Sequence, residues 1–168
     1  MWHFTGSERP PFAEEPGPGQ ESVWDYPRPP ALVPCQRTVR VESDGVLLAE
    51  TQAACRVLET ASPPTYYIPA ADVNFDALVA APGSSFCEWK GAAVYWALAG
   101  GGEAVAWSYP EPSERFAAIR DAVGFYPGRV ACFVDGERVR PQPGHFYGGW
   151  VTDEIVGPVK GEPGTGHW

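Results

Sequence analysis

The residues that most readily suggest chemistry stand in one short segment, CEWKGAAVYW (residues 87–96). Lys90 supplies an amine, and Trp89, Tyr95 and Trp96 are close to it in sequence. Aromatic neighbours can keep water away from a lysine and lower its pKa towards that of a base or nucleophile. Lys90 is therefore the first candidate catalytic residue. The alternative is a solvated lysine that follows a loop and pairs with a nearby glutamate.

Two carboxylates and a thiol complete the reactive groups. Glu59 and Asp72 could act together as acid and base or bind hydroxyl groups of a polar ligand. They could instead end a strand and cap a short helix. We take Glu59 with Lys90 as the candidate catalytic pair. Cys87 becomes a nucleophile only if a cation lowers its pKa, and no histidine lies near it in the sequence. The three histidines are His3, His145 and His167.

Aromatic residues with polar tips recur next to predicted strand ends or turns. Such side chains usually complete a core, but several of them together can also line a ligand pocket. The residues concerned are Tyr66, Tyr67, Trp107, Tyr109 and Tyr126. With Asp72, Cys87 and Tyr95 they form the predicted ligand-binding set. The period of a strand places Ala93 and Tyr95 on one face and Trp96 on the other, with Lys90 preceding the strand.

Composition and charge exclude several classes of protein. The 168-residue chain has a net charge of −9 and no cluster of Lys and Arg, which disfavours a nucleic-acid partner. No run of about 18 apolar residues is present to span a membrane, and the first residues lack the basic and apolar regions of a signal peptide. We therefore expect a soluble, cytoplasmic protein with no membrane partner.

The cysteines and histidines do not suggest a metal site. The four cysteines are Cys35, Cys55, Cys87 and Cys132. They form no C-x-x-C pair, and no set of His, Cys, Asp and Glu has the spacing of metal ligands. We expect free thiols, no disulfide, no metal and no cofactor.

The elements expected around these residues are mainly strands. Three segments, 37–51, 92–109 and 129–139, each join strand-like runs through a Gly-containing turn, which predicts three antiparallel hairpins. Apolar residues at spacings of three and four predict a helix over 113–123, with Ser113 as its N-cap. A second short helix is expected at about 73–79. The fold class is mainly β (α+β), barrel- or tent-like.

The chain divides by composition into three parts. Residues 1–34 are a Pro/Gly-rich arm, residues 35–140 form the β domain, and residues 141–168 are a Gly-rich tail that we expect to pack on the domain. With 19 Gly and 19 Pro, long helices are not expected.

Six residues or motifs follow one another along the chain: Glu59, PPTYYIP (63–69), Asp72-Val73, CEWKGAAVYW (87–96), AWSYPEP (106–112) and VGFYPGRV (123–130). In this order they closely resemble the domain of unknown function 427 family. The resemblance covers roughly residues 37–139. The family is also called nucleotidyltransferase-like, but nucleotidyl transfer normally needs a carboxylate pair that holds metal ions. The chain has no Asp-x-Asp and no P-loop, so we disfavour that reaction.

Two functions of different kinds remain. One is a small-molecule-binding domain, which could be enzymatic, with a site of Glu59, Tyr67, Lys90, Tyr95 and Trp107. The other is a non-catalytic module in which arm and tail dock a protein partner or a second copy of the chain. That module would use Trp24, Tyr26, Tyr147 and Trp150. A pocket around Lys90 favours the first function, and a flat apolar patch continuous with the arm favours the second.

Overall fold

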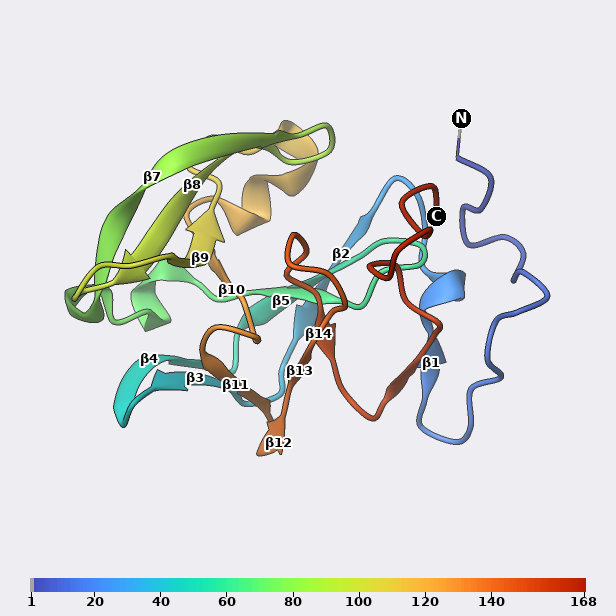
Figure 1. Cartoon of the computed structure of the whole chain (residues 1–168), viewed down its shortest axis with the longest axis horizontal. Coiled ribbons are helices and arrows are strands. Elements are labelled where there is room, and N and C mark those ends of the chain that lie inside the picture. Colours follow the sequence, from blue (N-terminus) through green and yellow to red (C-terminus); the bar gives the residue numbers. More distant parts are fainter. Residues whose placement is uncertain (1) are drawn as a thin grey trace.

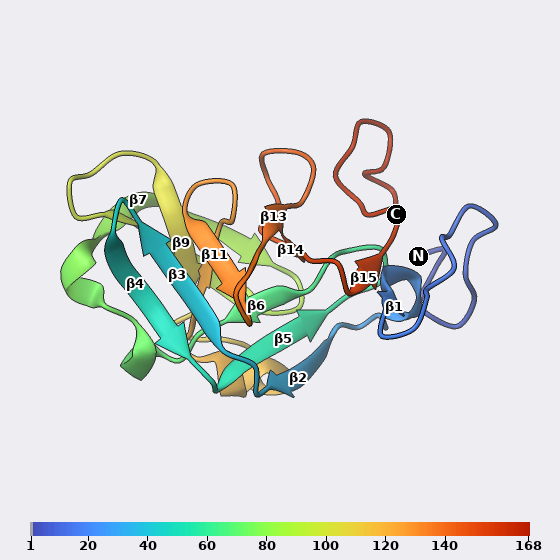
Figure 2. The same ribbon diagram turned by 90° about the horizontal axis from the view of Figure 1, so that it is seen from below.

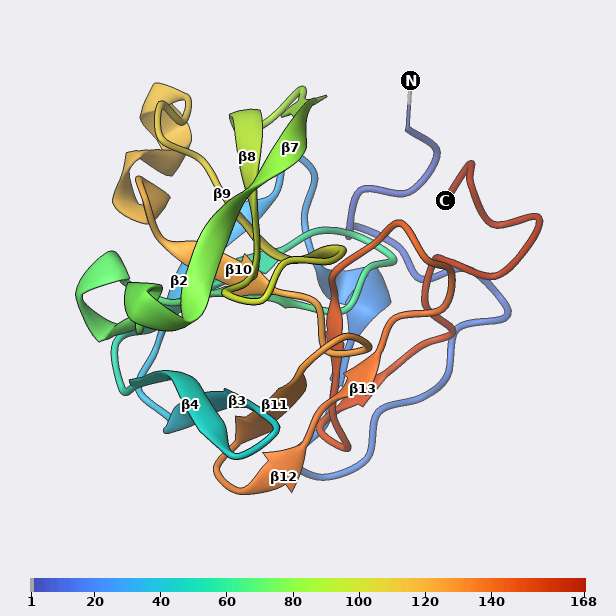
Figure 3. The same ribbon diagram turned by 60° about the vertical axis from the view of Figure 1, so that its left-hand side comes forward.

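The computed structural model describes residues 2–168 and consists mainly of antiparallel β-strands. Sheet I has the strand order β10-β9-β8-β7, sheet II the order β12-β11-β3-β4, and sheet III the order β2-β5-β6. The two four-stranded sheets lie at an angle to each other (Figures 1 and 3). Among the described residues, no sheet closes into a barrel.

Each of the three sheets is made of short strands. Sheet I contains Leu78–Cys87 (β7), Gly91–Leu98 (β8), Ala104–Ser108 (β9) and Val123–Phe125 (β10). Sheet II contains Val39–Ser43 (β3), Val46–Thr51 (β4), Ala131–Val134 (β11) and Glu137–Arg138 (β12). Sheet III contains Ala31–Cys35 (β2), Ala54–Leu58 (β5) and Thr65–Tyr67 (β6).

All three predicted hairpins are confirmed. Strands β3 and β4, β8 and β9, and β11 and β12 pair antiparallel. In the first, Asp44 and Gly45 have φ of 49° and 80°, and in the last, Asp135 and Gly136 have 48° and 82°. Positive φ at both central residues is the tight turn that follows the twist of two adjoining strands, and Asp-Gly adopts it readily.

Both segments predicted as helical contain a short 3₁₀ helix, and in each the helix is shorter than the predicted range. The segment predicted as one helix over 113–123 contains a 3₁₀ helix, η4 (Glu114–Ile119), that is kinked at Phe116. Phe116 and Ile119 are both buried, and a spacing of three suits a 3₁₀ helix as well as an α-helix. Val123 instead belongs to β10, where it exchanges two backbone hydrogen bonds with Ile68.

The expected helix at about 73–79 is replaced by a 3₁₀ turn and a strand. The 3₁₀ helices η2 (Ala70–Asp72) and η3 (Phe75–Ala77) precede β7, which begins at Leu78. Strand β7 is interrupted by a register shift between Ala81 and Ser84, so its two halves are short and its pattern is weak. It forms the outer edge of sheet I.

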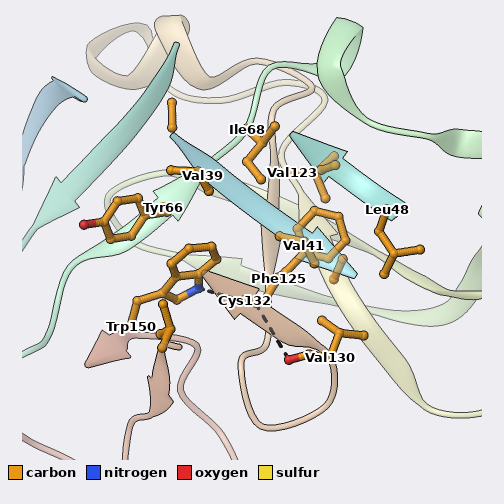
Figure 4. Close-up of a cluster of buried hydrophobic side chains, with 14 of the residues drawn as sticks. Val39, Val41, Leu48, Tyr66, Ile68, Val123, Phe125, Val130, Cys132 and Trp150 are labelled. Carbon is orange, nitrogen blue, oxygen red and sulfur yellow. Dashed lines mark hydrogen bonds between the residues drawn. The ribbon is translucent and has the colours of Figure 1, made fainter. Parts of the chain in front are cut away.

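The main core lies between sheets I and II (Figure 4). Val39, Val41 and Phe125 are fully buried in it. The tail contributes Trp150, whose indole N–H donates to the carbonyl oxygen of Phe125 at 2.9 Å and whose ring stacks on Tyr66 with centroids 4.6 Å apart. The tail therefore contributes Trp150 to the core.

Arm and tail lie side by side at one end of the molecule (Figures 1 and 2). The short strands β1 (Glu21–Ser22) and β15 (Ile155–Val156) pair in parallel, and β13 (Arg140–Pro141) pairs with β14 (Trp150–Val151). After β1, the 3₁₀ helix η1 (Val23–Asp25) buries Trp24. The β domain begins earlier than residue 35, because residues 31–34, expected in the arm, belong to β2 and pair with β5.

No helix within residues 2–168 has the length and apolar character needed to cross a membrane.

The four cysteines are all free thiols. Cys35 and Cys132 are buried, and Cys55 and Cys87 are partly exposed.

Candidate functional site

Eight of the ten predicted site residues line a cleft of about 710 Å³ between sheet I and the terminal segments. This volume is within the usual range for small-molecule sites. The lining residues are Trp2, Glu59, Thr65, Tyr67, Ser85, Phe86, Cys87, Glu88, Trp89, Lys90, Ala93, Tyr95, Trp107, Tyr109, Tyr126, Arg129, His145, Phe146, Tyr147, Gly148 and Lys160. A second hollow of about 430 Å³, beside the β3–β4 turn, contains none of the predicted site residues.

Strand β8 supplies one wall by its alternation. Ala93 and Tyr95 line the cleft, whereas Trp96 points to the other side, where it packs on Phe75 and the main core. The Tyr95 hydroxyl is 2.7 Å from Oγ of Ser85 on β7, so the two hydroxyl groups hydrogen-bond across the sheet. The predicted division of the two faces of this strand is confirmed.

Lys90 ends the turn between β7 and β8. Ser113 stands at the predicted N-cap position of η4, but its side chain makes no capping hydrogen bond there. Its backbone N–H instead donates to the Lys90 carbonyl at 3.1 Å and its hydroxyl to the Trp89 carbonyl at 2.7 Å. Gly91 follows with φ of 108°, and a Cβ there would lie 3.2 Å from the Glu111 carbonyl oxygen. Glycine thus lets this turn lie close to the start of η4.

The Lys90 amine faces aromatic rather than acidic neighbours. Its Nζ is 5.9 Å from the centroid of the Tyr109 ring, within the range of a cation–π contact. Among the described residues, no carboxylate oxygen lies within 4.0 Å of it. The amine is therefore a hydrogen-bond donor without an ion-pair partner at the cleft.

Tyr67, Trp107 and Tyr126 form a continuous aromatic wall. The Trp107 indole N–H donates to the Tyr67 hydroxyl at 3.2 Å, and the Trp107 and Tyr126 rings are 4.6 Å apart. The indole lies close to the backbone of two glycines, because a Cβ at Gly124 or Gly148 would be 2.6 or 2.3 Å from its ring carbons. One of these glycines is on β10 and the other in the tail.

Burial keeps two tyrosines of the cleft, Tyr67 and Tyr109, protonated. It raises the pKa of Tyr67, although the hydrogen bond from Trp107 acts in the opposite direction. Burial likewise raises the pKa of Tyr109, an effect that the nearby Lys90 charge reduces. Both phenols therefore stay neutral at physiological pH and can each donate and accept a hydrogen bond.

Glu59 lines the cleft, but its carboxylate is paired with Arg28 rather than with Lys90. The Arg28 Nε donates to Oε2 of Glu59 at 3.3 Å, and only 2% of the Arg28 side chain is exposed. The same guanidinium donates to main-chain oxygens of Phe4, Thr60 and Trp168. We expected Glu59 to compensate the Lys90 charge. The arm, whose path the sequence did not predict, brings a closer cation.

The structure leaves two predicted site residues outside the cleft. Tyr66 is only 1% exposed and stacks on Trp150, because neighbouring strand residues face opposite sides and Tyr67 faces the cleft. Asp72 accepts a hydrogen bond from the Thr51 hydroxyl at 2.7 Å, next to sheet II. Tyr109, Tyr126 and Cys87 do line the cleft.

A cysteine–histidine pair is not formed. His145, in the tail, lines the same cleft as Cys87, yet none of the hydrogen bonds among residues 2–168 joins the thiol and the imidazole. Nor do three or more His, Cys, Asp or Glu side chains gather as metal ligands in the part of the chain that the structure describes.

The sequence analysis missed the residues that the termini contribute, above all Lys160. This lysine lines the cleft with only 9% of its surface exposed. Its Nζ is 3.3 Å from the main-chain oxygen of Trp168 and 5.3 Å from the centroid of the Trp2 ring. Burial lowers its pKa and the Arg28 charge lowers it further, with Glu59 acting in the opposite direction. The sequence offered one signal for Lys160, because this residue and Lys90 are the only two lysines in the chain.

Fold and site together define a mainly antiparallel β protein with a deep, aromatic-lined cleft that holds two amines. A family model described as a domain of unknown function (DUF427) matches residues 31–136, more than half of the chain. The chain belongs to this family. No curated protein matches its sequence. Trp2, His145 to Gly148 and Lys160 lie outside the matched region, so the cleft is completed by the terminal segments.

Proposed function

We propose that this protein binds a small organic molecule in the cleft between sheet I and the terminal segments. The supporting observation is that one concave site of about 710 Å³ combines an aromatic wall with phenol hydroxyls and two amines. Sites for small molecules have this composition, a mostly apolar lining with a few converging polar groups. A cytoplasmic location belongs to the same proposal, because four free thiols suit a reducing compartment.

Two exposed phenylalanines at the cleft support a ligand with an apolar body. Phe86 and Phe146 each expose 78% of their surface, more than any other large apolar side chain among the described residues, and both line this cleft. Exposed rings of this kind are costly in water and gain stability when a partner surface covers them. Their position makes the bound molecule the natural cover.

Binding, rather than a particular reaction, is what the cleft supports. The candidate catalytic pair was Lys90 with Glu59, but the Glu59 carboxylate is held by Arg28. In the predicted pair Glu59 was the candidate acid or base, and that role needs a carboxylate that is free to reach the reacting proton. We therefore assign Lys90 to ligand recognition.

The alternative function, a docking module of arm and tail, has less support. Three of the residues it needs, Trp24, Tyr26 and Trp150, are buried against their own chain. The fourth, Tyr147, lines the cleft. These side chains cannot meet a partner unless the terminal segments detach.

A thermal-shift screen tests the proposal, because a molecule that binds only the folded protein raises its melting temperature. Lys90→Met should abolish or weaken the shift caused by the best compound while leaving the melting temperature of the unbound protein nearly unchanged. Arg138→Met is the matched control, since it removes one surface charge on β12 away from the cleft. If the shift is the same in all three proteins, the compound binds elsewhere; if a diverse library causes no shift, the proposed function is wrong.

A further inference from the structure

Both lysines of this chain line the same cleft. The sequence contains only Lys90 and Lys160, and all its other basic side chains are arginines. Lys90 comes from the β7–β8 turn and Lys160 from the tail, so widely separated parts of the chain deliver them to one site. In a protein of net charge −9, this places two cations in a cleft where 10 of the 21 lining residues are Phe, Trp or Tyr.

Neither amine is paired with an Asp or Glu side chain. Within residues 2–168 no side-chain carboxylate oxygen is within 4.0 Å of either Nζ. Of the two lining glutamates, Glu59 is paired with Arg28 and Glu88 is exposed. Lys160 is mostly buried and uses one of its three N–H donors, on Trp168. An anion that enters the cleft can accept hydrogen bonds from the remaining N–H donors of both amines.

The third cation at the cleft is already engaged. The Arg129 guanidinium lies over the Tyr126 ring at 4.2 Å and donates to the main-chain oxygens of Ala104 and His145. It holds the tail against β9 with two of its five N–H donors. Of the three lining cations, the Lys90 side chain donates no hydrogen bond within residues 2–168 and the Lys160 side chain donates one.

We propose, resting on the function proposed above, that the ligand is an anion with a planar apolar body. Its carboxylate or phosphate group is bound by Lys90 and Lys160, and its ring system lies against Trp107 and the exposed rings of Phe86 and Phe146. Charge-assisted hydrogen bonds are the stronger kind, and lysine ammonium groups accept either anion because their donors rotate. The aromatic lining contributes apolar contact area.

The preference for an anion depends on the tail. Lys160 lies outside the region of the DUF427 match, which ends at residue 136. The matched region therefore supplies one amine and the tail the other. We infer that the tail determines the charge of the molecule that this cleft accepts.

The test compares four probes that share one ring system: 2-naphthoate, 2-naphthyl phosphate, neutral 2-naphthamide and cationic 2-naphthylmethylamine. Ligand-observed NMR gives the dissociation constant of each for the intact chain. We expect one or both anions to bind about tenfold or more tightly than the amide, the loss typical of removing a hydrogen bond to a charged group. The stronger of the two anions identifies the group that the lysines receive.

Matched double variants assign the preference to the lysines. Lys90→Met with Lys160→Met should abolish the preference for anions but leave binding of the amide, which shows that the cleft is still folded. Arg115→Met with Arg138→Met makes the same change in net charge at exposed positions outside the cleft and should keep the preference. Replacing both lysines by arginine should restore most of it. Should the lysine double variant fail to fold, the arginine pair and the wild-type probe series decide the question.

The outcomes separate the two proposals. If the amide binds as tightly as the anions, or if the preference survives loss of both lysines, the anion assignment is wrong and the cleft remains a binding site. If no probe of any charge binds at millimolar concentration and the thermal-shift screen also finds nothing, the proposed function fails and the anion assignment with it.

Discussion

Replacing Gly148 by alanine tests how the tail packs on the aromatic wall of the cleft. A Cβ at this position would lie 2.3 Å from Cη2 of Trp107 and 2.7 Å from its Cζ3. Non-bonded carbon atoms prefer about 3.5–4.0 Å, so the methyl group needs roughly 1.2 Å or more of extra room. The indole also lies close to the backbone of Gly124, where an added Cβ would be 2.6 Å from its Cζ2, so the ring has little room to move that way. We expect the tail to move outward.

The cost can be estimated from other overpacked sites. Such substitutions usually destabilise a protein by about 1–3 kcal/mol, which corresponds to about 2–4 °C in melting temperature for each kcal/mol at this chain length. Urea denaturation followed by tryptophan fluorescence measures the loss. Gly166→Ala is the control in the same tail, because a Cβ there meets nothing within 4 Å.

A double-mutant cycle identifies the contact. Trp107→Phe removes much of the ring that the new methyl group would meet, so Gly148→Ala should cost clearly less in that background. Two results would refute the reasoning. One is a Gly148→Ala protein as stable as Gly166→Ala, and the other is a cost that Trp107→Phe does not change.

The remaining predictions concern charge and pH. Lys160→Met should leave the melting temperature unchanged or raise it, because the buried amine has a lowered pKa and its charge opposes folding; a large loss would show that the amine is stabilising. Glu59→Gln should lower the Lys160 pKa further, as NMR titration of the lysine Cε signals would detect. Burial raises the pKa of Tyr67 in the folded protein. The neutral Tyr67 side chain therefore contributes its full stabilisation of the fold below the ordinary tyrosine pKa of about 10, and this contribution is lost as the pH rises above that value towards the pKa of the folded state. The difference in phenolate absorbance between wild type and Tyr67→Phe should therefore appear only with alkaline unfolding. Burial would raise the pKa of Glu21, but hydrogen bonds from Arg56 and Tyr26 lower it overall; Glu21→Gln should reduce stability near neutral pH, and that difference should disappear as the pH falls through the Glu21 pKa.

The local parts of the fold could be predicted because their signals are local. Asp44-Gly45 and Asp135-Gly136 specify tight turns by themselves, and the flanking strands follow. The helix over 113–123 could not be separated from a 3₁₀ segment by spacing alone. Its last residues were decided by distant partners, since Val123 pairs with Ile68 and with β9.

The site residues, too, could be predicted where local structure places them and could not where contacts between distant segments place them. Lys90, Tyr95 and Trp107 came together as expected because β8 and β9 are adjacent strands of one hairpin. Lys160 and Trp2 were missed, since their positions depend on contacts between the two ends of the chain that no local pattern encodes. Tyr66 was wrongly grouped with Tyr67, although the alternation of a strand already separates two consecutive residues.

The most direct test of the account follows the two lysines themselves. Protein labelled with ¹³C at lysine Cε gives two signals, one from Lys90 and one from Lys160, which Lys90→Arg and Lys160→Arg assign. On titration with 2-naphthoate or 2-naphthyl phosphate, whichever binds more tightly, we predict that both signals shift along the same saturation curve, because both amines line one cleft. Saturable binding of that probe with neither signal shifting, or with only one of them shifting, would contradict the account.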